Sequence, residues 1–577
     1  MSQQEIKNLG GYFYRASIAD FSKIPGNPIA YWVSPKITNI FSKGNPLSTY
    51  SDIGKGLDTG DNNRFLRMWY ETSNSTQKWV PCQKGGPFRK WYGNNDFVIN
   101  WANDGKELKE FSGSNLRNSH NYFRSGLSWT RISSSNTAFR FFPEGSIFES
   151  TGPCLFPEKL PFYSVAGFLN SKLTLTFLKF MAPTLDFQSG HISALPILNF
   201  DWNVLDLENN VKKCISIAKK DWDSYEGSWE FYSPFLSHLD CNKLLLKASY
   251  QDLRKEWQNI TLEMQRLEEE NNHIFIDAYD LQDELTPEVP LSEITLNCNP
   301  YYRYGGNLTD EEREQRLQSD TLAELISYII GCMMGRYSLN SEGLVYANAG
   351  NKGFKTLVEE GVYARFPADS DGILPITIKA WFEDDIATRV EEFVRTVWGA
   401  DHLEENLKFI ATSLNLAAIK PVKKGGETSR ETIRRYLSTQ FFKDHLKTYK
   451  KRPIYWLFSS GKEKAFECLV YLHRYNETTL PRMRTEYVTP LLGQMDSRIE
   501  RLRLLQNEAE TAEAKLIGKE IDSLTRQLTE LRSFDDQLKH YADMKIQLDL
   551  DDGVKINYGK FGTLLAEVKA ITGDKVE

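Results

Sequence analysis

The chain has 577 residues, a formal net charge of −7, and 41% hydrophobic and 25% charged residues. This composition is ordinary for a soluble globular protein of about three to five domains, and it excludes a uniformly basic coat. Any nucleic-acid site must therefore be a local patch. No two of the seven cysteines lie within four residues of each other, which excludes a CxxC-type zinc site and a disulfide framework.

The first section, 1–205, contains short apolar alternations separated by turn residues. The runs "FVINW" (97–101), "LSWTRISS" (127–134), "AFRFF" and "SIFES" predict strands, whereas 163–181 has the length and spacing of one helix. A strand-rich α+β domain is therefore expected over 1–205.

Helical spacing dominates the remainder. A connector over 206–290 contains the long periodic run 242–279, and a mixed, mainly helical domain is expected over 291–482. Its predicted helices are 309–335, 383–415, 429–448 and 462–474. The apolar run 325–335 is about half a membrane span, so it predicts a buried helix rather than a membrane segment. With no apolar signal region at "MSQQEIKNLGG", a cytoplasmic protein is expected.

The last section, 483–577, begins with a coiled-coil-like pattern. The spacing of three and four residues is carried by Ile517, Ile521, Leu524, Leu528 and Leu531, with Leu538 seven residues beyond, and Gly518 is a candidate corner. The pattern predicts an antiparallel coiled-coil hairpin followed by a C-terminal tail. The whole chain is thus assigned to the α+β class.

Basic and aromatic residues cluster in "KWVPCQKGGPFRKWYGNNDFVINWANDG" (78–105). The wider window from Asp61 to Pro143 holds twelve Lys and Arg against six Asp and Glu. A glycine pair, Gly85 and Gly86, permits close approach of the backbone to a ligand. Two interpretations remain open: a patch that contacts a phosphate backbone and bases, or a hairpin tip whose tryptophans are core and whose cations are solvated.

Candidate catalytic motifs are weak. "GKGLDTG" (54–60) matches neither GxGxxG nor a phosphate loop, and "NPYY" (299–302) lacks the second proline of an NPPY loop, so a turn is the better interpretation. Asp96, Glu107 and Lys109 form no more than a chance nuclease-like trio. HExxH and GxSxG are absent from the sequence, and we expect no catalytic centre and no metal site in this chain.

A resemblance to a known family is carried by many stretches in order. Among them are "GLDTGDNNRFLRMWYE" (56–71), "GGPFRKWYGN" (85–94), "GLSWTRISS" (126–134), "PTLDFQSGHISALPI" (183–197), "NPYYRYGG" (299–306) and "LDLDDGVKINYGKF" (548–561). Over nearly its whole length the chain resembles the C-terminal half of the PglX (BrxX) family, the adenine-specific DNA methyltransferases of type 1 BREX phage-defence systems. This family is related to single-chain restriction–modification enzymes.

The resemblance implies that residues 1 to about 205 are a target recognition domain. It also implies that S-adenosylmethionine and the NPPY loop belong to an N-terminal methyltransferase half, so this chain by itself carries no cofactor and no activity. Expected partners are double-stranded DNA, that methyltransferase half and other BREX proteins, without a membrane. The alternative is a protein–protein scaffold with incidental DNA contact, to which a second basic run, 447–458, fits equally well.

The candidate DNA-binding residues follow from the basic window. Cations for phosphates or guanine edges are Lys84, Arg89, Lys90, Arg117, Arg124, Arg131 and Arg140. Polar donors are Asn94, Asn95, Asn121, Ser133, Ser134 and Ser135, and the aromatic candidates for stacking or packing include Trp91, Tyr92 and Trp129.

Overall fold

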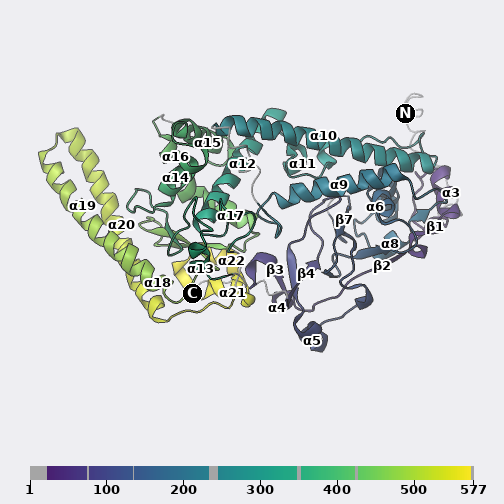
Figure 1. The fold of residues 1–577 in the computed structure, drawn as a ribbon, viewed down its shortest axis with the longest axis horizontal. Helices are drawn as coiled ribbons and strands as arrows, with labels where there is room; N and C mark the ends of the chain where they lie inside the picture. The colour runs from purple at the N-terminus through teal and green to yellow at the C-terminus, as the bar shows by residue number, and fades with distance from the viewer. Residues whose placement is uncertain are drawn as a thin grey trace, which may run out of the picture. The chain divides into compact units, whose positions relative to one another are not determined.

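The computed structural model describes residues 22–73, 77–133, 136–232, 245–346, 352–422 and 426–573 (Figure 1). The chain groups into two compact units, each assembled from separated stretches. Unit 1 comprises Met1–Arg67, Thr76–Trp222 and Lys255–Gly306, and unit 2 comprises Met68–Ser75, Asp223–Arg254 and Asn307–Glu577. Helices and strands occur together, which confirms the α+β class. The predicted division into four consecutive domains stays a prediction.

The strands of unit 1 form two four-stranded sheets and a two-stranded ladder within its described residues. One sheet has the order β2-β9-β6-β7 and is antiparallel, and the other has the order β3-β5-β4-β8, with β4 and β8 parallel. The ladder pairs β1 with β10. The bounds are β1 (Asn45–Pro46), β2 (Ser51–Gly54), β3 (Leu66–Met68), β4 (Trp79–Gln83), β5 (Phe97–Asn100), β6 (Gly126–Trp129), β7 (Phe139–Phe142), β8 (Ile147–Phe148), β9 (Cys154–Pro157) and β10 (Pro196–Ile197). The strands expected within 97–101, 127–134, "AFRFF" and "SIFES" are all present.

The helices of unit 1 include one correction. The single helix expected over 163–181 is two helices, because Ser171 leaves the helical conformation and its side chain accepts a hydrogen bond from Thr174 N. The bounds are α3 (Pro35–Lys43), α4 (Asn62–Phe65), α5 (Ala102–Glu110), α6 (Phe162–Asn170), α7 (Lys172–Met181), α8 (Ser189–Ser193), α9 (Leu205–Asp223) and α11 (Pro300–Arg303), with 3-10 turns η2 (Leu47–Thr49), η4 (Ser119–Asn121) and η6 (Leu291–Glu293). Helix α10 (Leu246–Ala278) contributes residues to both units.

The core of unit 1 joins residues from widely separated turns and strands. Leu57, Phe65, Ile99, Phe148 and Phe156 are almost fully buried in one cluster. Strand β5 contributes Ile99, in agreement with the strand expected there. Burial of such large side chains supplies the main stabilisation of the unit, at roughly 1.5–3 kcal/mol each.

Unit 2 is mainly helical around a three-stranded antiparallel sheet of order β11-β13-β12. Its bounds are η3 (Trp69–Glu71), α12 (Asp310–Met333), α13 (Phe354–Glu359), β11 (Ile373–Pro375), α14 (Ile386–Trp398), α15 (Leu403–Ala417), α16 (Ser429–Tyr436), η7 (Leu437–Phe441), α17 (Phe442–Thr448), β12 (Tyr455–Ser459), β13 (Glu467–Tyr471), α18 (Thr479–Arg482), η8 (Met483–Val488), α19 (Thr489–Glu508), α20 (Thr511–Asp543), η9 (Leu550–Asp552), α21 (Val554–Gly559), η10 (Gly562–Leu564) and α22 (Val568–Thr572).

The helix predicted near 462–474 is wrong. Residues Glu467–Tyr471 form the central strand β13, and all five are buried. A short apolar run is compatible with a buried helix or a buried strand, because neither has a polar face that would reveal its period. Pairing with β11 and β12 decided the outcome. By contrast, the run 325–335 is buried as predicted, mostly in α12, and within the described residues no helix is long and apolar enough to cross a membrane.

Helices α19 and α20 lie side by side and are joined at Ala509 and Glu510 (Figure 1). The corner is therefore not at Gly518, which lies inside α20. Gly518 instead faces the Gln506 side chain, which also donates a hydrogen bond to Ala514 O at 3.1 Å. Among the predicted interior positions of α20, Ile517 is half-buried, and the others are buried: Ile521, Leu524, Leu528, Leu531 and Leu538. Coiled-coil supertwist of this pair stays a prediction.

Candidate functional site

The loop between β4 and β5 (residues 84–96) lies largely inside unit 1. Arg89, Lys90, Trp91 and Tyr92 are only 1–3% exposed. Four consecutive buried residues, two of them cationic, require partners for their charges and polar groups, because an unpaired buried charge is very costly.

Arg89 is held by acidic, amide and aromatic groups. Its Nη1 lies 3.3 Å from Asp221 Oδ2 of α9, and its Nη2 donates to Asn297. The guanidinium also stands 5.0 Å from the centre of the Trp222 ring. The same Asp221 carboxylate accepts hydrogen bonds from the backbone N–H groups of Asn297 and Cys298. Arg89 therefore fastens the loop to α9 and to the 291–299 segment.

Lys90 and Trp91 share one carboxylate. Lys90 Nζ lies 2.7 Å from Glu268 Oε2, and Trp91 Nε1 donates to Glu268 Oε1 at 2.7 Å. The Lys90 backbone N–H donates to Thr295 Oγ1 at 2.9 Å. Glu268 is itself 3% exposed on α10. The loop is thus bound to α10 by a buried ion pair with a charge-assisted hydrogen bond beside it.

These contacts correct the expectation of an exposed basic loop. Arg89 and Lys90 are neither exposed for a phosphate contact nor solvated at a hairpin tip in this structure, because both side chains are buried and ion-paired. Trp91 and Tyr92 are packing residues, and Asn94 is buried with its amide donating to Pro87 O at 2.9 Å. Asn95 is buried as well. Lys84 is partly exposed and pairs with Glu149 at 3.4 Å.

The glycine pair also has an internal explanation. A Cβ on Gly86 would lie 2.7 Å from the Asn94 side chain, and Gly85 has φ +84° with its Cβ position 2.9 Å from Thr151 O. Close packing inside unit 1 is therefore sufficient to explain both glycines.

The remaining paired cations lie nearer to the surface. Arg117 pairs with Asp58 at 2.8 Å, Arg124 lies 4.0 Å from Glu158, and Arg131 makes two hydrogen bonds to Asp186 at 2.8 and 3.0 Å. Hydrogen bonding to Arg131 lowers the pKa of Asp186 despite some burial. Their exposed side-chain fractions are 40%, 43% and 27%.

The polar candidates are placed unevenly. Asn121 is buried and donates to Asp52 Oδ2 at 2.7 Å, and Ser133 Oγ donates to Asn136 O at 3.3 Å. Ser134 and Ser135 lie outside the described residues. Trp129 is fully buried and donates from Nε1 to Phe187 O, so it packs rather than stacks on a ligand. DNA contact by the exposed candidates stays a prediction.

Six of the seven predicted cations therefore have an acidic partner. The partners are Asp58, Glu149, Glu158, Asp186, Asp221 and Glu268. Every one of these acids lies outside the basic window from Asp61 to Pro143. The local excess of positive charge in the sequence is thus largely neutralised by residues that the fold brings in from elsewhere in unit 1.

Arg140 is the exception among the seven. It is 2% exposed on β7, its Nη2 lies at 3.5 Å from Thr130 Oγ1, and its Nε has no hydrogen-bond partner among the described residues. No carboxylate of a described residue lies within ion-pair distance of 4.0 Å. Burial, with the nearby charge of Arg89, lowers the pKa of Arg140 to about 10, so the group stays charged at neutral pH.

Sequence reasoning missed a buried polar cluster in unit 2. Arg336 is fully buried and donates to the hydroxyls of Tyr337 and Tyr471 at 3.1 and 2.9 Å. Five buried atoms of this region have no partner among the described residues: Arg336 Nη2, Glu226 Oε1, Tyr455 Oη, His445 Nδ1 and His473 Nδ1. Donors and acceptors occur together, which suits ordered water. The cluster draws on residues 226 to 473, so no local pattern indicates it.

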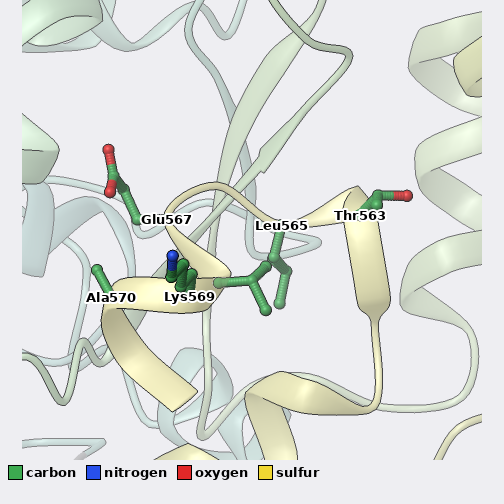
Figure 2. A pocket seen from close by; sticks show the side chains of 6 residues that line it. Thr563, Leu565, Glu567, Lys569 and Ala570 are labelled. Atoms are coloured by element: carbon green, nitrogen blue, oxygen red, sulfur yellow. The ribbon is translucent and has the colours of Figure 1, made fainter. Parts of the chain in front are cut away.

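The hollow of about 290 Å³ in the C-terminal segment offers little chemistry. It is lined by Thr563, Leu565, Glu567, Val568, Lys569 and Ala570, and Figure 2 shows Thr563 and Glu567 on either side of Leu565. One carboxylate and one ammonium group do not make a catalytic or metal-binding set. In the described ranges no group of three or more His, Cys, Asp or Glu side chains is arranged to hold a metal ion.

Comparison with known proteins gives two extensive similarities. The adenine-specific methyltransferase BrxX of Escherichia coli O9:H4 (strain HS) is 50% identical over 570 residues, which are 97% of this chain and 46% of that protein. The adenine-specific methyltransferase PglX of Lacticaseibacillus casei (strain Zhang) is 36% identical over 583 residues, 95% of this chain and 45% of that protein. No protein-family model matches. The chain spans about half the length of the curated relatives it matches.

Proposed function

We propose that this chain is the DNA-recognition and assembly portion of an adenine-specific DNA methyltransferase of the BREX type, corresponding to the C-terminal half of such an enzyme. The observation that carries the proposal is 50% identity along 97% of the chain to an adenine-specific methyltransferase. A matched share of 46% of that relative supports a portion rather than the whole.

In the proposed division of labour, this chain holds the duplex and reads the bases around the target. The methyltransferase portion binds S-adenosylmethionine, takes the flipped adenine and transfers the methyl group to N6. Unit 1 is the proposed recognition unit, because it contains the predicted recognition section 1–205 apart from residues 68–75.

The proposed phosphate contacts are Arg117 and Arg124, whose side chains are exposed, together with Arg131 and Lys84, whose side chains are 27% and 19% exposed. Each now has a carboxylate partner, but an exposed ion pair such as those of Arg117 and Arg124 is worth only about 0–1 kcal/mol. Exchange of that partner for a DNA phosphate therefore costs little. Arg89 and Lys90 are excluded from this role because their pairs are buried, and breaking such a pair costs about 3–5 kcal/mol.

The test is binding of the full chain to duplex DNA by fluorescence anisotropy at several salt concentrations. The proposal expects affinity that falls steeply with salt, since each phosphate contact releases counterions. An Arg117→Gln, Arg124→Gln double variant should flatten the salt dependence, whereas Lys352→Gln, which removes an exposed cation of unit 2 that pairs with Glu360, is the matched control. Absence of salt-sensitive binding by the unaltered chain would contradict DNA recognition.

A second candidate is a protein–protein scaffold, and the neutralised basic window favours it. The junction of α19 and α20 adds exposed apolar side chains: Leu504 is 67%, Leu505 43% and Leu516 67% exposed. Copurification of this chain with candidate partner proteins distinguishes the scaffold function from the DNA-recognition function. A stable complex with the methyltransferase portion or another BREX protein, combined with no DNA affinity, selects the scaffold.

A further inference from the structure

Arg140 holds an unusual position for a cation. In the sheet, Arg140 of β7 is opposite Ser128 of β6. On the other edge of β7, the backbone of Arg140 forms an isolated parallel β-bridge with Trp91 of the loop between β4 and β5. Trp91 N donates to Phe139 O at 2.9 Å and Phe141 N donates to Trp91 O at 2.8 Å, so the backbone around Arg140 is fixed on both edges. A guanidinium with little access to water and no carboxylate within ion-pair distance lacks the compensation that buried charges normally have.

Two donors converge on one oxygen next to this guanidinium. Thr130 Oγ1 lies 3.0 Å from Gly86 N, whose N–H donates to it, and 3.5 Å from Arg140 Nη2. The same hydroxyl donates to Gly86 O at 2.9 Å. Thr130 Oγ1 thus occupies the position that an anionic oxygen would take between a backbone N–H and a guanidinium.

The position is close to solvent. Gly86 and Pro87 are exposed, and Thr130 is half-buried. The Ser128 hydroxyl, which is opposite Arg140 in the sheet, has no hydrogen-bond partner among the described residues. The Asp96 carboxylate acts on Arg140 electrostatically and not through a hydrogen bond.

We propose that Arg140, Thr130 and the Gly86 N–H form a site for a single oxyanion, either a phosphate of the DNA backbone or free phosphate. In its DNA form the inference rests on the function proposed above. Rotation of the Thr130 side chain turns its hydroxyl into a donor to the anion, and Arg140 Nε and Nη2 supply charge-assisted hydrogen bonds. The anion provides a counter-charge within hydrogen-bond distance of Arg140, whereas Asp96 acts on it only through space.

The direct test is titration of the full chain with inorganic phosphate at constant ionic strength, followed by broadening of the ³¹P resonance. Saturable broadening in the millimolar range is expected for the unaltered chain. Arg140→Gln should weaken it by about tenfold or more, the usual effect of losing a charge-assisted hydrogen bond. Lys352→Gln, at an exposed cation of unit 2 that pairs with Glu360, is the matched control and should leave phosphate binding unchanged. Equal binding by the unaltered chain and Arg140→Gln, or no saturable binding, overturns the site.

A second variant tests the site in case Arg140→Gln destabilises the fold. If Arg140→Gln lowers the melting temperature markedly, Thr130→Val removes one donor with little change in volume at a half-buried position. It should weaken phosphate binding several-fold while the melting temperature is retained, and unchanged binding by this variant overturns the site.

Duplex DNA distinguishes the two sources of the anion. A tenfold loss of DNA affinity in Arg140→Gln identifies a backbone phosphate. Arg140-dependent phosphate binding with unchanged DNA affinity identifies free phosphate. If the unaltered chain binds phosphate through Arg140 but binds no DNA, the proposed function fails while the oxyanion site stands.

Discussion

Replacing Lys90 by methionine tests whether the loop is a buried structural element. Lys90 Nζ lies 2.7 Å from Glu268 Oε2, and both side chains are 3–4% exposed. Methionine preserves most of the volume but leaves the Glu268 carboxylate buried, with the Trp91 Nε1–H as its one remaining hydrogen-bond donor among the described residues. Removing one partner of such a pair destabilises by about 3–5 kcal/mol. The exposed-loop hypothesis instead predicts unchanged stability and weaker DNA binding.

A double variant separates the pair from general damage. Glu268→Gln keeps an acceptor for Trp91 Nε1 and removes the charge, so Lys90→Met with Glu268→Gln leaves no unpaired buried ion. The double variant should therefore be more stable than the sum of the two single effects predicts, with a coupling energy of about 2 kcal/mol or more. Arg117→Met is the control, since an exposed pair contributes about 0–1 kcal/mol.

The assay is hydrogen exchange of peptides covering β4 and β5, followed by mass spectrometry. A global melting curve is less suitable, because a chain of two units need not unfold in one step. A loss of 3–5 kcal/mol corresponds to exchange faster by roughly a hundredfold to a few thousandfold. Exchange in Lys90→Met within about threefold of the unaltered chain would refute the reasoning.

Further predictions concern charge, pH and the helical pair. Arg117→Gln combined with Arg124→Gln should reduce the slope of log affinity against log salt by roughly 0.9 for each DNA phosphate that is no longer neutralised. The slope is measured by fluorescence anisotropy on duplex DNA, and an unchanged slope would exclude both residues as phosphate contacts. Burial lowers the pKa of His445 to about 3, and its Nε2 accepts backbone N–H groups of Ile454 and Tyr455, so the folded state binds fewer protons than the unfolded state. Unit 2 should therefore lose stability as pH falls from about 6.5 toward 3, and His445→Gln should reduce that loss in urea titrations; an equal pH dependence in both proteins would contradict it. Burial raises the pKa of Glu226 to about 7, so its effect on stability has the opposite pH dependence. The contribution of Glu226 to the stability of unit 2 declines as pH rises from about 4.5 to 7, and Glu226→Gln should remove this decline. Deleting residues 484–548 should leave the strand signal of unit 1 intact in circular dichroism while it weakens assembly with the methyltransferase portion; loss of the strand signal would show that unit 1 depends on the helical pair.

The sequence alone identified most elements whose pattern is long or strictly alternating. The periodic runs 242–279 and 309–335 became α10 and α12, and "FVINW" became β5, because their own apolar spacing determines which face is buried. Short segments took their structure from tertiary contacts. Residues 462–474 became strand β13 through pairing with β11 and β12, and a single Ser171 cap divided the helix expected over 163–181.

The candidate site shows a sharper division between sequence and tertiary structure. By itself the sequence determined that cations, aromatics and glycines concentrate between Asp61 and Pro143. It did not determine which of those charges remain available, since charge is neutralised through space and the acids that pair with Arg89, Lys90 and Arg131 come from Asp221, Glu268 and Asp186. Only the tertiary structure placed these carboxylates beside their partners. It also left Arg140 buried without one, because no carboxylate of the described chain comes within ion-pair distance of that guanidinium.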